Sequence, residues 1–187
     1  NEGQATFITP MNFGDATNTG VEVDIMKYFK WFGIKANYTY THSSITTNKR
    51  KREGTEVVTV YQTRPLYGQA AHVANLSFLF NFPKYGVEAQ LSGSYTGKRL
   101  SEISNWFDND IWEAGYVELD ASVEKSFRSG LSIFAKASNL LDSPVVRFIN
   151  PNSLTESLKD YPKYDGAVIE RQEWHDIALV VGIRFSL

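Results

Sequence analysis

The stretch that decides the fold is IALVVGIRFSL, residues 177–187. Every odd position in it is apolar, from Ile177 to Leu187, whereas the even positions are mostly small, polar or charged, as at Gly182 and Arg184. Successive side chains of a β-strand point to opposite faces, so a period of two predicts a strand with one apolar face and one polar face. The sequence therefore predicts an amphipathic strand here.

Six other stretches show the same alternation. They lie at residues 20–26, 33–41, 72–82, 87–96, 117–127 and 131–138. In each of them apolar or aromatic residues alternate with polar or charged ones, and Phe134 is an exception. No helical period competes with this pattern. The sequence therefore predicts an all-β fold of about seven meandering antiparallel strands.

The connections between these strands alternate in length. Three contain the short turn sequences MKYFKWFG, PKYG and RSG, and three are long, at about residues 44–70, 100–115 and 141–172. Outer-membrane β-barrels have short periplasmic turns and long outer loops, so this sorting predicts an antiparallel transmembrane barrel segment. If the short turns are periplasmic, the last strand ends at the periplasmic rim. A soluble β-sandwich, whose strands also alternate, is an alternative.

Composition bounds the class of protein. The 187 residues carry a net charge of −2 with a pI near 6.0, so no basic excess points to nucleic acid. The chain has no cysteine, which excludes a disulfide framework and a thiolate metal site. Mean hydropathy is −0.30, and no stretch approaches the roughly 18 apolar residues of a membrane-spanning helix. A hydropathy test does not detect barrel strands, because their apolar lipid-facing residues alternate with polar lumen-facing residues and the mean hydropathy of the strand stays low.

Aromatic residues fall into two groups that fit the two water interfaces of a barrel. Those beside the short turns or the chain end are Phe29, Trp31, Phe32, Phe82, Tyr85, Phe127 and Phe185. Those near the long connections are Tyr38, Tyr40, Tyr95 and Tyr116. We interpret the two groups as girdles at opposite ends of the strands.

The sequence shows no enzyme constellation. His42, His72 and His175 lack metal-ligand spacing. No Gly-x-Ser-x-Gly motif and no phosphate-binding glycine-rich loop is found. We therefore expect neither an enzyme nor a cofactor site.

Several motifs resemble those of one family. GVEVDI (residues 20–25), KASNLLD (residues 136–142) and GIRFSL (residues 182–187) resemble elements of TonB-dependent outer-membrane receptors, in the order in which those receptors carry them. RPLYGQAAHVANLSF (residues 64–78) is similar to a stretch of the branch typical of the Bacteroidetes. In such receptors the closing strand is read by the outer-membrane assembly machinery, which implies that role for Phe185 and Leu187. The usual terminal aromatic residue is replaced here by Leu187.

The resemblance implies a barrel of about 22 strands that encloses an N-terminal plug domain. Residues 1–187 would then be the C-terminal part of one barrel domain, its last seven strands, with the plug absent from this chain. About eight strands are needed to close the smallest transmembrane barrel, and an open edge in lipid leaves unpaired backbone groups that cost several kcal/mol each. We therefore expect the chain to be a piece of a longer polypeptide.

The implied function is active transport across the bacterial outer membrane. The barrel wall surrounds the plug, the outer loops capture a large and scarce nutrient, and energy from the TonB system displaces the plug. Ferric siderophores are the commonest cargo of the family, and glycans or peptides are alternatives known from the Bacteroidetes branch.

Two sets of side chains are candidate contacts. In NWFDNDIW (residues 105–112), Trp106, Phe107 and Trp112 cluster with two acids, Asp108 and Asp110, which suits ligand capture by an outer loop, although packing within the loop explains the cluster equally well. The second set faces the lumen if its apolar neighbours face lipid, so it could contact the plug: Glu88, Glu118, Asp120, Lys136 and Arg184. A ladder of charges along the lumen wall is the plainer interpretation of that second set.

The expected partners follow from this placement. They are the rest of the same barrel and its plug, the TonB system through the plug, and outer-membrane lipid, with a surface lipoprotein as a further candidate. The basic run NKRKRE (residues 48–53) could contact phosphates of lipopolysaccharide, although such runs in loops are more often only solvated. The competing function is a small self-contained barrel (an adhesin, porin or membrane hydrolase), which would need residues 4–10 as an eighth strand.

Overall fold

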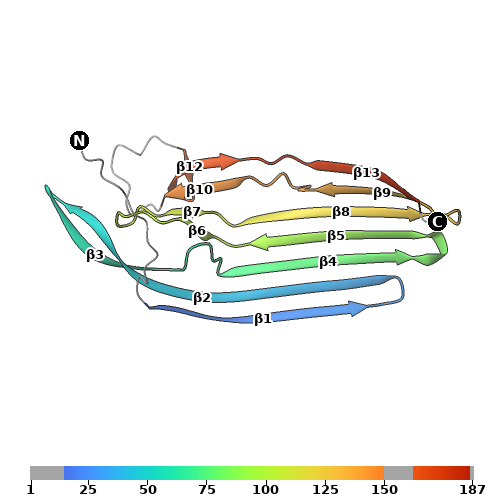
Figure 1. Ribbon diagram of the computed structural model, residues 1–187, viewed down its shortest axis with the longest axis horizontal. Helices are drawn as coiled ribbons and strands as arrows, with labels where there is room; N and C mark the ends of the chain where they lie inside the picture. Colours follow the sequence, from blue (N-terminus) through green and yellow to red (C-terminus); the bar gives the residue numbers. More distant parts are fainter. Residues whose placement is uncertain (1–14, 150–161, 186–187) are drawn as a thin grey trace, which may run out of the picture.

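The computed structural model describes residues 15–149 and 162–185, and these form antiparallel strands and one short 3-10 helix (Figure 1). Seven strands make a meander in the order β1-β2-β4-β5-β8-β9-β13. Their bounds are β1 Ala16–Tyr28, β2 Phe32–Glu53, β4 His72–Phe82, β5 Val87–Thr96, β8 Tyr116–Ser126, β9 Leu131–Ser138 and β13 Ala178–Phe185. The seven strands predicted from the alternation are confirmed, although β2 is far longer than expected.

The short turns all lie at one end of this sheet and the long connections at the other (Figure 1). We call these the turn end and the loop end. The β4–β5 turn contains the 3-10 helix η1 (Pro83–Tyr85) and then Gly86, whose φ of +60° is left-handed. A Cβ at Gly86 would also collide with the carbonyl oxygen of Ser126, so only glycine fits this turn.

The turn end carries stacked aromatic rings, as the girdle interpretation requires. The rings of Phe29 and Phe32 lie 5.5 Å apart, and those of Trp31 and Phe82 lie 5.7 Å apart across neighbouring strands. Near the loop end, the ring of Tyr40 lies 5.2 Å from that of His72.

The long connections contain strands of their own, which the alternation did not predict. β3 (Glu56–Arg64) pairs with the distal half of β2, so the two form a hairpin that extends beyond β1 and β4. The other connections contribute a five-stranded sheet, which we call the platform, in the order β11-β12-β10-β7-β6. Its bounds are β6 Arg99–Glu102, β7 Ile111–Glu113, β10 Val145–Ile149, β11 Lys163–Tyr164 and β12 Ala167–Glu173.

The platform prolongs the meander without a change of register between β5 and β8. At the loop end of β5 and β8, Thr96 pairs with Tyr116. Three residues further toward the loops, Arg99 pairs with Glu113, which is the same register. Because paired residues of antiparallel strands share a face, the two faces of the meander continue onto β6 and β7. Figure 1 shows β6 and β7 in line with β5 and β8.

The described hydrophobic core sits at the loop end and not in the meander. Ala114, Val146, Phe148 and Ala167 form one buried cluster, with Trp112 and Ile169 packed against it. The meander is a single layer with many exposed apolar side chains, such as Leu179 at 74% and Val181 at 75% exposure on β13. In the described residues no second sheet covers that face, as a soluble sandwich would require.

Candidate functional site: the polar face and its strap

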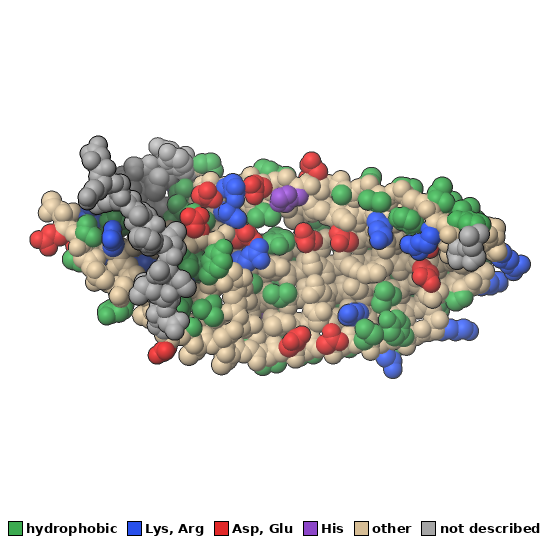
Figure 2. Space-filling model, in the orientation of Figure 1, with side chains coloured by type: hydrophobic (Ala, Val, Ile, Leu, Met, Phe, Trp, Pro, Cys, Tyr) green, Lys and Arg blue, Asp and Glu red, His purple; other side chains and the backbone are tan. Residues whose placement is uncertain are grey.

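The side chains of the meander point to two faces, and the strand register shows which residues share a face. One face is apolar, with Ala36, Leu76, Gly93 and Leu119 in one cross-strand row. On the other face Leu79, Gln90, Ser122 and Lys136 form a row, and Figure 2 shows acidic and basic side chains spread over this polar face. All of the residues expected to face the lumen lie on it, by register: Glu88, Glu118, Asp120, Lys136 and Arg184.

The polar face of the meander carries more acid than base. β8 places Glu118, Asp120 and Glu124 along one line, and Glu124 lies directly opposite Glu88. Like charges opposite each other destabilise a sheet. Arg184 compensates, because its Nη1 lies 3.3 Å from both carboxylate oxygens of Glu124.

Aromatic rings pack over two glycines on this face. The ring of Phe134 lies over Gly182, where a Cβ would come within 2.7 Å of the ring atom Cε1. Tyr28 lies over Gly33 in the same way, with Cδ1 at 2.7 Å from a Cβ built on that glycine. These rings, Glu88 and Lys136 line a pocket of about 400 Å³ near the turn end. Phe134, the exception to the alternation, is therefore accommodated because the opposing residue has no side chain.

At the loop end, residues 103–110 cross the polar face of the β2–β3 hairpin, and we call this segment the strap. Lys49 of β2 and Asp110 anchor it through an ion pair of 2.6 Å. Both side chains are almost fully buried, at 2% and 3% exposure. Lys49 also donates to the carbonyl oxygen of Ser104, and Ser104 N donates to Asp110 Oδ1 at 2.8 Å.

A second cation approaches the same carboxylate. Arg64 Nε lies 3.8 Å from Asp110 Oδ2, and within the described part of the chain neither atom has a hydrogen-bond partner. An unpaired buried charge is strongly destabilising. Among the described residues, Asp110 is therefore the anion that neutralises both buried cations, and displacement of the strap would leave Lys49 and Arg64 without it.

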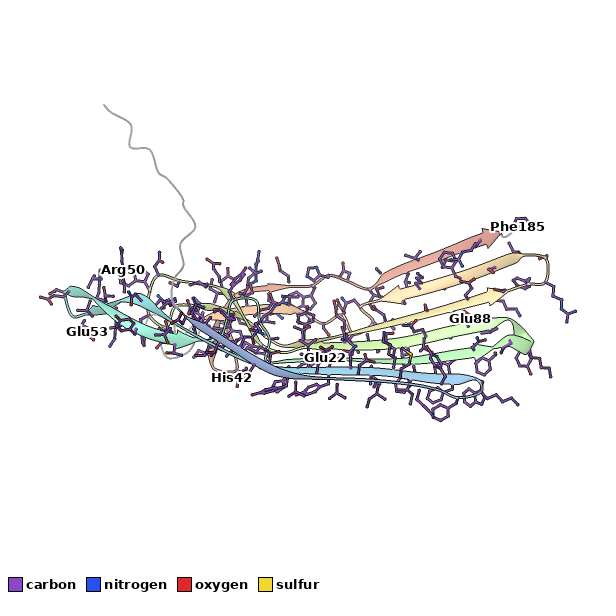
Figure 3. All side chains as sticks on the ribbon, turned by 60° about the horizontal axis from the view of Figure 1, so that its bottom comes forward. Glu22, His42, Arg50, Glu53, Glu88 and Phe185 are labelled. Atoms are coloured by element: carbon purple, nitrogen blue, oxygen red, sulfur yellow. The ribbon has the colours of Figure 1, made fainter. Side chains whose placement is uncertain are left out.

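The backbone of the strap is also joined to the hairpin. Arg50 N donates to Asn105 O at 2.9 Å and Phe107 N donates to Arg50 O at 2.8 Å, which aligns Trp106 beside Arg50. Gln62 Nε2 donates to Asp108 Oδ1 at 3.0 Å. Figure 3 shows Arg50 on this hairpin, at the opposite end of the molecule from Phe185.

The three aromatic residues proposed as one ligand-contact loop occupy two different places. Trp106, at 38% exposure, and Phe107 belong to the strap. Trp112 lies in β7, where it packs against the core of the platform. The structure therefore separates Trp112 from the other two.

The run NKRKRE lies at the distal end of β2 and not in a loop. Lys49 is buried against Asp110, and Lys51 Nζ pairs with Glu53 Oε1 at 2.9 Å. Arg50 and Arg52 alternate with these lysines along the strand, so they are on the opposite face.

Lys98, between β5 and β6, caps the platform core. Its Nζ lies 4.6 Å from the ring centroid of Trp112 and 4.9 Å from that of Phe148. Burial lowers the pKa of the Lys98 ammonium from its usual value, and the nearby Asp165 carboxylate opposes that shift.

Sequence reasoning missed the strap anchors. Lys49, Arg64 and Asp110 stand in separate polar stretches, and only the fold brings them together. The described part of the chain holds no group of three or more His, Asp or Glu arranged for a metal ion. It also contains no helix that is long and apolar enough to cross a membrane.

In a comparison with known families, the family "TonB dependent receptor-like, beta-barrel" matches residues 1–140. The chain belongs to this family. Neither the curated proteins nor the solved structures yielded a match. Family membership confirms the resemblance and the barrel-segment fold, but it carries no information on a Bacteroidetes origin, which stays a prediction.

Members of this receptor family are outer-membrane transport proteins. In barrels of this kind the short turns are periplasmic, the outward face is apolar and the inward face is polar. The apolar face of the meander has the character of the outward face of such a barrel, and the charged face has that of the inward face. The family match ends at residue 140, but β13 continues the same sheet, since it pairs with β9 from Ala178–Ser138 to Phe185–Leu131.

Proposed function

We propose that this chain forms wall, extracellular loops and assembly strand of a TonB-dependent active transporter that imports a large, scarce nutrient. The observation that carries the proposal is the single-layer sheet with one apolar face and one charged face, which suits a wall between lipid and an occupied lumen. The strap over the polar face gives the wall an element at the extracellular mouth, where cargo would first be met.

The wall is one part of a larger closed barrel, and its plug domain is supplied by sequence outside residues 1–187. The support is the state of the two outermost strands. In the described residues β1 pairs only with β2, and β13 pairs only with β9. Unpaired strand edges are costly in lipid, so both edges need further strands. An intact mass near 21.1 kDa for the unproteolysed product would contradict this.

Two groups of residues contact other components in this proposal. Glu88, Glu118, Asp120, Lys136 and Arg184 face the plug, to which the TonB system couples. Trp106 and Phe107 on the strap contact cargo, and Trp112 supports the platform beneath them. Phe185 and Leu187 belong to the assembly signal; Leu187 lies outside the described residues.

Ferric siderophores are the favoured cargo because they are the commonest in the family, with glycans and peptides as the alternatives. We expect no enzymatic activity and no resident cofactor. The surrounding partners are outer-membrane lipid and, as a candidate, a surface lipoprotein.

Uptake by cells tests the transporter. Uptake of labelled ferric siderophores, glycans and peptides is compared between cells that make the full receptor and cells that lack it. Receptor-dependent uptake of ferric siderophores that stops when the inner-membrane proton gradient is dissipated supports the proposal. Gradient-dependent uptake of glycans alone would overturn the cargo assignment, and uptake that survives dissipation would overturn active transport.

A further inference from the structure

A row of arginines crosses the platform on one face. Arg99 of β6 pairs in register with Glu113 of β7, Glu113 with Arg147 of β10, and Arg147 with Arg171 of β12. Residues paired in this way share a face, so the four side chains form one continuous row across four strands.

The row lies on the lipid side of the sheet. Along β5 and β6 the odd-numbered positions Leu91, Gly93 and Tyr95 are on the apolar face. Arg99 follows in the same phase, because the pairing with β8 and β7 keeps one register as far as Leu100 and shifts only beyond it. On the opposite face, Lys98 covers the ring of Trp112, as alternation requires. Arg99 is four residues beyond Tyr95, or roughly 13 Å along the strand, which places the row just outside the apolar band.

The arginines of the row are partly exposed, whereas the central Glu113 is buried. Arg99 Nη2 lies 2.5 Å from Glu113 Oε1, and Arg147 Nε lies 3.9 Å from Glu113 Oε2. The Glu113 side chain is only 6% exposed, whereas those of Arg99 and Arg147 are 34% and 31% exposed. Arg171, whose Nη1 lies 3.3 Å from Glu173 Oε1, is 46% exposed. Among the described residues, three guanidinium groups share two carboxylates, so the row keeps a surplus of one positive charge.

We propose that Arg99, Arg147 and Arg171 form a seat for phosphate groups on the headgroup of an outer-leaflet lipid. Guanidinium groups bind phosphate oxygens through paired charge-assisted hydrogen bonds. A seat just beyond the apolar band lies at the depth where lipid headgroups begin, and its positive surplus matches their charge. This inference rests on the outer-membrane placement within the proposed function, but not on transport.

The basic run of the hairpin serves as the internal comparison. Arg50 and Arg52 also lie on the outward face, by their alternation with the buried Lys49. They are further from the apolar band, near the tip of the hairpin that Figure 3 shows extending past the rest of the sheet. A general attraction between positive charge and lipid would involve the three arginines of the row as well as Arg50 and Arg52, whereas a seat involves only the row.

Lipid binding to the full receptor in detergent tests the seat. The probes are bis-phosphorylated lipid A, the same lipid after dephosphorylation, and inorganic phosphate, with binding read by native mass spectrometry. One variant is Arg171→Gln, whose partner Glu173 is itself well exposed. The other combines Arg99→Gln, Arg147→Gln and Glu113→Gln, so that no buried carboxylate is stranded. Arg50→Gln with Arg52→Gln is the control.

We expect the wild type to bind the phosphorylated lipid about tenfold more tightly than the dephosphorylated lipid, a preference of the size of one charge-assisted hydrogen bond. Both row variants should lose much of that preference, while the control keeps it and all variants keep uptake. An unchanged preference in the row variants, or an equal loss in the control, would overturn the seat. Displacement of the lipid by inorganic phosphate at millimolar concentration would show a free-phosphate site instead.

Discussion

At the scale of single residues, the contact between Phe134 and Gly182 is the clearest test of the polar face. In Gly182→Ala the new methyl group would fall on the Phe134 ring. We expect a loss of about 1–3 kcal/mol in the free energy of unfolding, the usual cost of overpacking. Urea titration of the full receptor in vesicles measures it.

Gly93→Ala is the matched control for that substitution. A Cβ at Gly93 would have its nearest neighbours at an ordinary 3.9 Å, so little change is expected. Adding Phe134→Leu to Gly182→Ala should recover part of the loss, because the two residues are in contact. If the single and double variants unfold alike, the ring is not the cause.

Asp110 holds the strap against the β2–β3 hairpin through its ion pairs with Lys49 and Arg64. Asp110→Asn leaves Lys49 and Arg64 as buried cations without an anion, which should cost about 3–5 kcal/mol locally. We expect rapid amide exchange and protease cleavage within residues 103–110, with the meander unaffected. Glu53→Gln breaks an exposed ion pair of about 0–1 kcal/mol and should leave the strap protected. Protection that persists in Asp110→Asn would contradict the anchoring role.

Lys98 gives a pH dependence with a defined sign. Burial lowers the pKa of Lys98 in the folded protein, whereas the unfolded chain keeps the usual pKa. At a pH between these two pKa values, the unfolded chain binds more protons than the folded chain. Unfolding free energy then rises with pH through this alkaline window. Urea midpoints of the full receptor, measured from neutral to alkaline pH, should rise in the wild type relative to Lys98→Met. Parallel curves for the two proteins would contradict the shift.

At the scale of elements, the sequence predicts strands wherever one face is apolar and the other polar. The strands of the meander obey this rule, and their order follows from the short turns. The distal half of β2 does not obey it, because TTNKRKRE is polar on both faces and is fixed by β3 and the strap. The platform strands were missed because they are short and interrupted by register shifts, as between Arg147 and Phe148.

The candidate site divides in the same way. The position of Glu88, Glu118 and Lys136 on one face of the sheet follows from local alternation, so the sequence alone predicts that they share a face. The pairing of Lys49 with Asp110 joins residues 61 positions apart, and nothing local marks either of them. The sequence groups Trp112 with Trp106 and Phe107 in one stretch, because β7 begins one residue after Asp110, where no glycine or proline signals a boundary.

At the scale of the whole molecule, a near-neutral net charge conceals a division between faces. The polar face of the meander is rich in acid, with Glu88 opposite Glu124 and Glu118 near Asp120. The outward face of the platform is arginine-rich. A barrel wall separates lipid from lumen, so charges on its two faces do not need to balance locally, and the overall charge of −2 says little about either face.

The facing of the wall can be tested with two neighbouring residues of β5. Leu91 lies on the apolar face between Phe78 and Ala121, and Ser92 lies on the polar face beside Asp120. Leu91→Arg should cost about 2–4 kcal/mol, because it places a charge in lipid near the middle of the strand. Ser92→Arg should cost far less, since it gains an acidic neighbour. The folded fraction of the full receptor after insertion into vesicles measures both, and equal tolerance of the two arginines would mean that the apolar face does not meet lipid.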